Sequence, residues 1–184
     1  AFWVAAIREC FEEAGVLLAY GPDGDLIRTE KPRWAEGLAR LRDELNAGSR
    51  SFLEVCQATE MQLAVDRVAY FSHWLTPEGP PRRYDTRFFV AMAPEAQEGV
   101  HDDSELVDSG WVRPADALAA RERGEIEMIH PTFVTLQALT AWDDVDVLLA
   151  DVAARRHLGR VTPDAALARE GLQQPADRQG DGDG

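Results

Sequence analysis

Residues 8–16 read RECFEEAGV, and they place the carboxylates of Glu9, Glu12 and Glu13 close together on one predicted helix. At about 100° of rotation per residue, the three side chains share a face of roughly 100°. Carboxylates in a last helical turn repel one another and oppose the helix dipole, at a cost of about 1–3 kcal/mol in total. A hard divalent cation would offset this cost, because Mg²⁺ prefers carboxylate oxygens. The alternative is an acidic face that is only solvated.

The sequence on either side predicts a helix followed by a buried strand. Apolar residues recur at helical spacing over residues 2–14, which predicts a helix with one apolar face. Gly15 fits the left-handed conformation that commonly ends a helix. The run VLLAY at 16–20 then predicts a buried strand.

The rest of the chain adds helices and strands in an order typical of an α+β domain. Residues 33–64 contain two helical patterns, which we interpret as a small helical insertion. Strands are predicted at 64–77 and 86–93, and a helix begins near Pro114. A long helical pattern covers 129–156. These elements predict an α+β fold in which the acidic helix packs against a mixed sheet.

Composition limits the partners and the cellular compartment. The chain has 33 acidic and 19 basic residues, a net charge of −14, which argues against a nucleic-acid partner. No apolar run reaches the roughly 20 residues of a membrane span. Cys10 and Cys56 form no disulfide framework and no zinc spacing, so we expect buried thiols in a reducing compartment. Lys31 is the only lysine, and this arginine-rich, alanine-rich composition predicts a bacterial, cytoplasmic protein.

Residues 8–16 also match a known pattern, Arg-Glu-apolar-x-Glu-Glu-x-Gly-apolar, at every position. This is the second half of the Nudix signature, and the chain therefore resembles a Nudix hydrolase. The resemblance implies an α/β/α sandwich with a mixed sheet, to which residues 33–64 would add a helical insertion. It also implies hydrolysis of a nucleoside diphosphate linked to another group, with Mg²⁺ or Mn²⁺ as the cofactor.

The resemblance assigns roles to individual residues of this chain. Glu9, Glu12 and Glu13 would be the metal ligands, and Glu9 would also orient or deprotonate the attacking water. Arg8 would hold the carboxylates in place by a salt bridge. Gly15 would permit the tight exit from the helix into the strand.

A further acid is expected from a loop that follows the sheet. Glu105 lies six residues before Trp111, in the position where related enzymes carry such an acid, and Glu98 is the alternative. The other interpretation is an acidic surface loop that is only solvated. The first half of the signature, with its glycine and another glutamate, is absent from the sequence given, as are the strands that precede it in the family. The missing starting Met predicts that the chain continues upstream.

Other segments resemble one branch, the nucleoside diphosphate-linked moiety X motif 19 proteins. They are AAIRECFEEAGVLLA, LRDELNAGSRSFLEVCQ, HWLTPEGPPRRYDTRFF and DSGWVRPADAL. This branch implies coenzyme A or acyl-coenzyme A as the small-molecule substrate. Dinucleoside polyphosphate, ADP-ribose and NADH stay open as alternative substrates. So do a catalytically silent binding module and a homodimer.

Two groups outside the signature are candidates for contact with such a substrate. Arg82, Arg83 and Arg87 could meet phosphates, since a guanidinium matches phosphate oxygens in a fork. Structural pairing with nearby acids is the alternative. His73 and Trp74 could line a pocket or belong to the core. Residues 1–172 are expected to form the Nudix domain, and 173–184, QQPADRQGDGDG, a disordered tail.

Overall fold

The structure is a computed structural model that describes most of the chain. The described residues are 1–31, 34, 37–76, 78, 82–95, 97, 110–154 and 160–161. They divide into two compact units, Ala1–Tyr70 with Phe89–Trp111 and Phe71–Phe88 with Val112–Gly184. The predicted tail at 173–184 lies outside the described residues.

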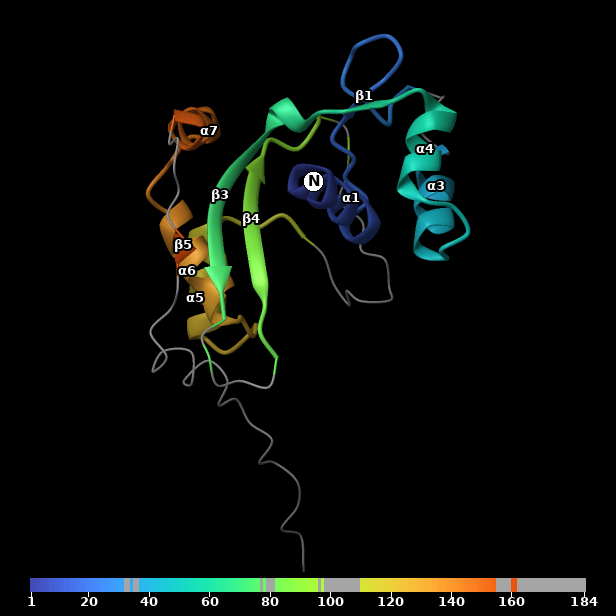
Figure 1. The fold of residues 1–184 in the computed structure, drawn as a ribbon. Coiled ribbons are helices and arrows are strands. Elements are labelled where there is room, and N and C mark those ends of the chain that lie inside the picture. Colours follow the sequence, from blue (N-terminus) through green and yellow to red (C-terminus); the bar gives the residue numbers. More distant parts are fainter. Residues whose placement is uncertain are drawn as a thin grey trace, which may run out of the picture. The chain divides into compact units, whose positions relative to one another are not determined.

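Groups of helices and groups of strands follow one another along the chain, as expected for an α+β fold (Figure 1). In chain order the elements are α1 (Phe2–Ala14), β1 (Ala19–Tyr20), α3 (Gly37–Asn46), α4 (Phe52–Thr59), β2 (Gln62–Leu63), the 3₁₀ turn η1 (Val65–Arg67), β3 (Val68–Leu75), β4 (Asp85–Ala91), α5 (Pro114–Glu122), α6 (His130–Leu139), α7 (Val145–Ala154) and β5 (Arg160–Val161). None of the helices in the described part of the chain is both long enough and apolar enough to cross a membrane.

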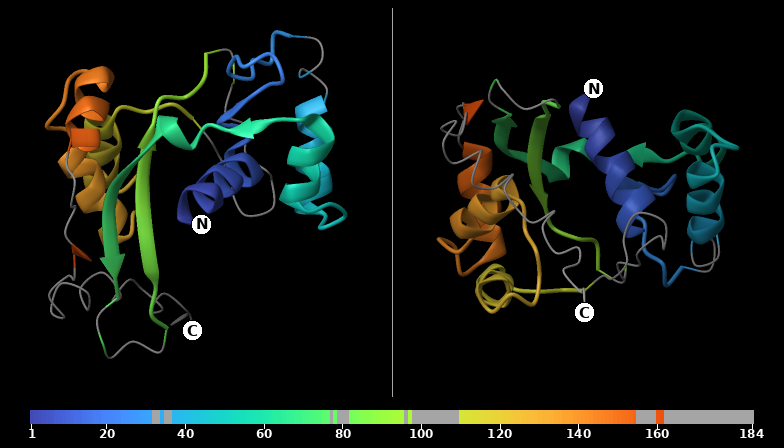
Figure 2. Two further views of the ribbon diagram at one scale, coloured as in Figure 1. Left: turned by 45° about the horizontal axis from the view of Figure 1, so that its top comes forward. Right: turned by 90° about the horizontal axis from the view of Figure 1, so that it is seen from below.

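The first unit is built around the buried face of α1. Ile7 and Phe11 of this helix are almost fully buried, as their spacing predicted. Helix α1 packs against α3, and α3 and α4 lie side by side in both views of Figure 2. The apolar residues that these two helices contribute to the same core are Leu38, Leu41, Leu45 and Val55. The predicted helical insertion therefore shares one core with the acidic helix.

The N-terminal end of α1 is tied to the two long strands. The indole N–H of Trp3 donates to the backbone oxygen of Val68, at 2.9 Å. The Trp3 ring also meets Phe89 edge-on, with 5.3 Å between centroids, and Tyr70 at 6.2 Å. Aromatic rings at these separations attract one another beyond their area of contact. The helix is thereby anchored at the end opposite its glutamates.

Residues 16–19 are buried as predicted and Tyr20 is half-buried, but only Ala19 and Tyr20 form a strand. Ala19 and Tyr20 pair antiparallel with β2, in the register Ala19↔Leu63. Before them, the backbone of Leu17 bonds to a side chain. The Gln97 Oε1 atom accepts from Leu17 N at 2.8 Å, and Gln97 Nε2 donates to Leu17 O at 3.0 Å. One amide thus satisfies the donor and acceptor that a neighbouring strand would otherwise satisfy.

Strands β3 and β4 are hydrogen-bonded neighbours in a sheet of order β4-β3-β5. Figure 1 shows β3 and β4 running in opposite directions, and β3 pairs parallel with β5 in the register His73↔Arg160. The strand predicted at 64–77 starts later than expected, because residues 65–67 form the 3₁₀ turn η1. The strand predicted at 86–93 is confirmed as β4, Asp85–Ala91.

The described part of the second unit contains three helices, and one prediction about them was wrong. The single helical pattern predicted over 129–156 is divided, because the described residues form two helices, α6 and α7, rather than one. The break has a local cause at each side. The Thr140 hydroxyl donates to Gln137 O at 2.7 Å where α6 ends. The Asp144 carboxylate accepts from Val147 N at 3.0 Å, which caps the start of α7.

Candidate active site on helix α1

The three glutamates of the signature lie on the side of α1 away from its buried face. Ile7 and Phe11 are almost completely buried in the core. Glu9 is exposed, while Glu12 and Glu13 are half-buried. The helical spacing therefore has the predicted result, since the carboxylates share the outer face and the apolar residues share the inner one.

Helix α1 ends immediately after these glutamates, at a left-handed glycine. Gly15 has φ 70° and ψ 8°, and its backbone N–H donates to Phe11 O at 3.1 Å. This is the conformation predicted for it, and it turns the chain toward the buried run that follows. The last turn of α1 contains no basic residue of its own, so two acids stand at the negative end of the helix dipole.

Arg8 pairs with two of the three acids. Its guanidinium contacts the Glu9 carboxylate directly, and its Nε lies 3.7 Å from Glu12 Oε2. The hydrogen bond to Glu9 raises the pKa of Arg8 further above its already high usual value, and the charge of Glu12 acts in the same direction. All three side chains reach solvent, so water and salt screen these ion pairs. The pairs therefore restrict where the carboxylates lie but add little to the stability of the fold.

A second arginine, which the sequence reasoning missed, supports the end of the same helix from α3. Arg42 Nε donates to the backbone oxygen of Glu12 at 2.8 Å, and its Nη2 bonds to the backbone oxygen of Glu13. Asn46 Nδ2 also donates to Glu12 O, at 3.2 Å. The final carbonyls of a helix have no partner within the helix, so these donors satisfy groups that would otherwise need water.

A sequence signal for this contact exists, but it is weak. Arg42 and Asn46 are four residues apart, so they share one face of α3 beside the leucine stripe. A polar pair at the edge of an apolar stripe is also common on helices that contact only solvent. Only the structure shows that the partner is the backbone of Glu12 and Glu13.

The two cysteines are less buried than the sequence suggested. Cys10 and Cys56 are free and half-buried. Burial raises the pKa of the Cys10 thiol, and the nearby charge of Glu13 raises it further. Burial also raises the pKa of Cys56. Both thiols therefore stay protonated near neutral pH, which argues against a nucleophilic role.

The acid expected from the loop cannot be placed, because Glu98 and Glu105 both lie outside the described residues. Within the described part of the chain, no three His, Cys, Asp or Glu residues are grouped closely enough to hold a metal ion. The donor chemistry on α1 does fit a hard cation, because its carboxylates share one face and lie partly open to solvent. The metal ligands named above stay a prediction.

The arginines near the strand ends are engaged in local contacts. Arg83 Nε donates to Thr76 O at 3.1 Å, and Arg87 Nη1 lies 3.3 Å from Asp85 Oδ1. Asp85 also contacts the imidazole of His73. Trp74 is buried and meets the ring of His130 edge-on, so it belongs to the packing of the second unit. Arg82 is exposed. Their predicted contact with substrate phosphates stays untested.

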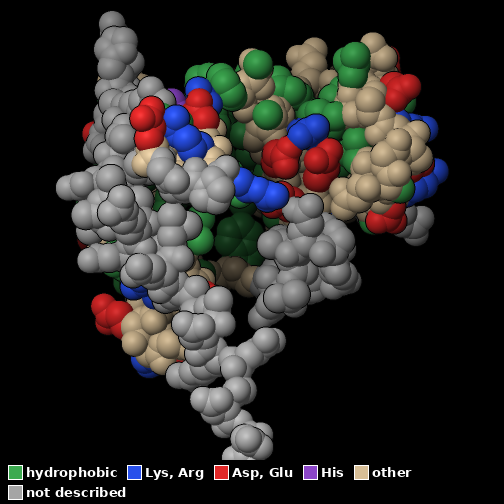
Figure 3. Space-filling model, turned by 60° about the horizontal axis from the view of Figure 1, so that its bottom comes forward, with side chains coloured by type: hydrophobic (Ala, Val, Ile, Leu, Met, Phe, Trp, Pro, Cys, Tyr) green, Lys and Arg blue, Asp and Glu red, His purple; other side chains and the backbone are tan. Residues whose placement is uncertain are grey.

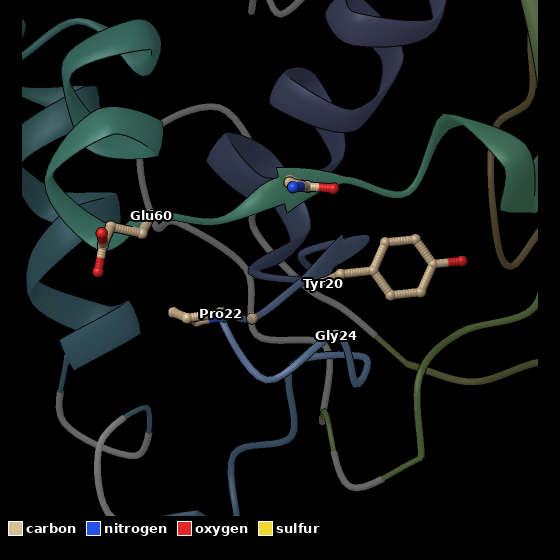
Figure 4. Close-up of a pocket in the computed structure, with 6 residues that line it drawn as sticks. Tyr20, Pro22, Gly24 and Glu60 are labelled. Carbon is tan, nitrogen blue, oxygen red and sulfur yellow. The ribbon is translucent and has the colours of Figure 1, made fainter.

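A small pocket lies elsewhere in the first unit, at the turn after β1. Its volume is about 240 Å³. Its lining residues are Tyr20, Gly21, Pro22, Gly24, Glu60 and Gln62. In Figure 4 the Tyr20 ring points away from Pro22 and Glu60. The pocket contains none of the signature glutamates, so it is separate from the candidate site.

Charges on the visible surface are mixed rather than segregated. Figure 3 shows acidic side chains beside basic ones, among hydrophobic and undescribed surface. No extended basic field is visible on the described part of this face. Such a field is the usual footprint of a protein that binds many phosphates of a nucleic acid.

The fold and the signature helix are those of a Nudix domain, and similarity to known proteins agrees. The structure resembles a solved NUDIX hydrolase from Alicyclobacillus acidocaldarius with a TM-score of 0.62 and 25% identity, covering 80% of this chain and 64% of that one. Residues 1–139 match the family described as the NUDT19 Nudix domain, and the chain belongs to this family.

Relatives from animals match this chain over part of their length. The acyl-coenzyme A diphosphatase NUDT19 of Homo sapiens is 34% identical over 148 residues, which cover 76% of this chain and 39% of that protein. The protein of the same name in Xenopus laevis is 28% identical, over 92% of this chain and 47% of its own length. The chain thus spans less than half the length of these relatives.

Proposed function

We propose that the chain contains the catalytic helix of a diphosphatase that hydrolyses coenzyme A or acyl-coenzyme A. The observation that carries the proposal is the complete Arg-Glu-x-x-Glu-Glu-x-Gly stretch on α1, with its acids outward and its helix end at Gly15. Membership of the NUDT19 Nudix family supports the reaction class. The names of the human and frog relatives support the substrate.

The proposed site uses carboxylates and one arginine. Glu9, Glu12 and Glu13 would hold Mg²⁺ or Mn²⁺, together with Glu105 or its alternative Glu98. When bound, such a cation neutralises charge on the phosphates and lowers the pKa of water. Glu9 is the most exposed of the three helical acids, so it is the one we assign to orient the attacking water and accept its proton.

Arg8 keeps that acid in place during the reaction. Its guanidinium contacts Glu9 and reaches toward Glu12, which restricts two flexible side chains to one region of the helix face. Water then attacks one phosphorus, the bridging P–O bond breaks, and the leaving phosphate takes the electron pair. Positioning and electrostatics supply the acceleration of such a reaction, without a covalent intermediate.

The proposal is tested by turnover with a panel of diphosphates in Mg²⁺ or Mn²⁺. The panel contains coenzyme A, an acyl-coenzyme A, NADH, ADP-ribose and a dinucleoside polyphosphate. Glu12→Gln and Glu13→Gln should each lower kcat/KM by about 100-fold, because each removes a charged ligand oxygen. Glu125→Gln is the control, since Glu125 pairs only with Arg123 in the second unit among the contacts described, and it should change kcat/KM less than twofold.

The outcomes separate the alternatives that the sequence leaves open. Turnover of NADH or ADP-ribose without coenzyme A would keep the enzyme class and reject the substrate. A chain that binds coenzyme A but hydrolyses nothing in the panel would be a silent binding module. Unchanged turnover in both glutamine variants would reject the assignment of α1 as the catalytic helix.

The remaining proposals concern the setting of the enzyme. We place it in a bacterial cytoplasm on composition and on its free, half-buried thiols. Cell fractionation with an antibody to the chain checks this location. A homodimer is equally a proposal, and light scattering at two protein concentrations checks it. Residues 1–172 are proposed as the Nudix domain, and 173–184 as a tail outside it.

A further inference from the structure

We infer that Arg42 of α3 is a positioning residue for the metal-binding glutamates, acting through the backbone of the last turn of α1. The inference rests on the proposed function, because it concerns the same site. It adds a residue from outside the Nudix signature, on the predicted helical insertion. Arg42 does not touch the reacting atoms in this assignment; it fixes the place from which Glu12 and Glu13 project.

The contact is specific in its geometry. Two different nitrogens of one guanidinium bond to the carbonyl oxygens of two consecutive residues, Glu12 and Glu13. Asn46, one turn further along α3, adds a third hydrogen bond to the Glu12 oxygen. Residues that terminate a helix normally fray, because their carbonyls lack partners within it. Here the backbone carbonyls of both glutamates are hydrogen-bonded to a side chain of the neighbouring helix α3.

The charge of Arg42 is also placed where the site needs it. Glu12 and Glu13 oppose the helix dipole, whose negative end lies at these same carbonyls. Arg8 pairs with Glu9 and Glu12, and Arg42 lies at the C-terminal end of α1. Arg42 supplies a fixed positive charge at that end through neutral carbonyls rather than through the carboxylates. The carboxylate oxygens are therefore not consumed by this contact.

A planar, forked side chain suits this task better than a lysine. Arginine presents several N–H groups in a rigid arrangement, whereas lysine offers one flexible ammonium. A lysine at position 42 would retain the charge and lose one of the two simultaneous carbonyl bonds. Arg42 is half-buried, and the leucines at 38, 41 and 45 fix the helix that presents it. Arg42 is therefore held by a well-packed helix, as a residue that positions others requires.

The test measures Mn²⁺ binding by calorimetry or electron paramagnetic resonance, beside thermal unfolding and turnover of coenzyme A. The variants are Arg42→Ala, Arg42→Lys and Asn46→Ala. Arg40→Ala is the matched control, because Arg40 is on the same helix, is 75% exposed and pairs with Glu44. All binding is measured well below the unfolding temperature of each variant, so that loss of fold and loss of positioning are separated.

We expect Arg42→Ala to weaken Mn²⁺ binding by about tenfold or more, as found for residues that orient metal ligands. Arg42→Lys should recover part of this loss, and Asn46→Ala should lose about twofold to threefold. The Mg²⁺ concentration for half-maximal turnover should rise in the same order. Arg40→Ala should stay within twofold of the wild type in every measurement. If Arg42→Ala does not fold, Arg42→Lys and Asn46→Ala give the result.

Unchanged Mn²⁺ affinity in folded Arg42→Lys and Asn46→Ala would overturn the inference and leave a purely structural cap. The turnover panel decides the proposed function separately. A wild type that binds Mn²⁺ but hydrolyses no diphosphate rejects the proposed reaction, while weaker Mn²⁺ binding in the variants still supports the positioning role. A wild type that binds no Mn²⁺ rejects the positioning role.

Discussion

Gly15 connects the candidate site to the core through its backbone conformation. Its φ of 70° lies in the left-handed region, where any residue that carries a Cβ is strained. It follows Glu12 and Glu13 closely and precedes the buried run at 16–20. A change at this position therefore alters both the end of the acidic helix and the entry into the core.

We expect Gly15→Ala to destabilise the protein by about 1 kcal/mol, because alanine is strained at positive φ. Gly37→Ala is the matched control, since Gly37 begins α3 and a Cβ there would meet nothing within 4 Å. It should stabilise by roughly 0.5 kcal/mol, because alanine loses less backbone entropy than glycine in a helix. Urea denaturation measures both, and effects of the same sign in the two variants would contradict this account.

Gln97 is the buried polar residue that replaces a strand beside Leu17. The residue is 5% exposed, and besides its two bonds to Leu17 its side chain donates to Ile27 O at 2.8 Å. Gln97→Leu should lower the free energy of unfolding by about 3 kcal/mol, because it leaves one buried N–H and two carbonyls without these partners. Gln57→Leu is the control on the exposed side of α4, and it should change stability by less than about 0.5 kcal/mol.

At the scale of elements, α4 has the most complete cap in the described chain. Ser51 Oγ accepts from Glu54 N, and the Glu54 carboxylate accepts from the backbone N–H and hydroxyl of Ser51. These hydrogen bonds, with a smaller contribution from the charge of Arg50, hold the pKa of Glu54 below its usual 4.5. The ionised carboxylate therefore favours the folded state above that pH.

The lowered pKa of Glu54 predicts the direction of a pH effect. A carboxylate with a depressed folded pKa stabilises the fold above its unfolded pKa, and this contribution is lost as pH falls through the folded pKa. The stability difference between wild type and Glu54→Gln should therefore shrink below the usual pKa of 4.5. Urea titrations between neutral pH and acid measure it. A difference that stayed constant, or grew, on acidification would contradict the assigned cap.

The elements that were predicted correctly are those whose signal lies within a short stretch of sequence. The helix over 2–14 was predicted because Ile7 and Phe11 mark its buried face and Gly15 marks its end, all within one short stretch. Arg42 was missed because its partners are backbone oxygens 29 and 30 residues away, which carry no side-chain signal. Gln97 was missed for the same reason, with Leu17 80 residues distant.

Two further misses arose where hydrogen bonds from side chains to the backbone override an apolar pattern. The helix predicted over 129–156 breaks at residues 140–144, because the side chains of Thr140 and Asp144 bond to nearby backbone. The strand predicted at 16–20 is shortened, because Gln97 takes the bonds of Leu17. Apolar periodicity shows which residues are buried, but not which backbone groups pair.

At the scale of the whole molecule, the sequence separates a core-forming part from the last 12 residues. Residues 173–184 contain no apolar residue larger than proline or alanine, so they can bury little surface. Ending the chain after Leu172 should leave the unfolding temperature within about 1 °C and kcat/KM within twofold. Thermal scans and turnover of coenzyme A compare the two chains. A clear loss of either would show that these residues belong to the domain.

The net charge of −14 makes every bound cation a potential stabiliser of the whole fold. A specific site is distinguished by saturation. Mn²⁺ at about 100 times its Kd should add about 2.7 kcal/mol of stability, which raises the unfolding temperature by roughly 5–10 °C.

General screening of the charge would act at all acids, whereas the proposed site requires those of α1. The double variant Glu12→Gln and Glu13→Gln should therefore lose most of the Mn²⁺-induced increase, although its net charge changes by only two of fourteen units. NaCl at matched ionic strength should raise the unfolding temperature of both proteins equally. If the double variant kept the full Mn²⁺ effect, the stabilisation would come from diffuse screening, and α1 would not be the metal-binding helix.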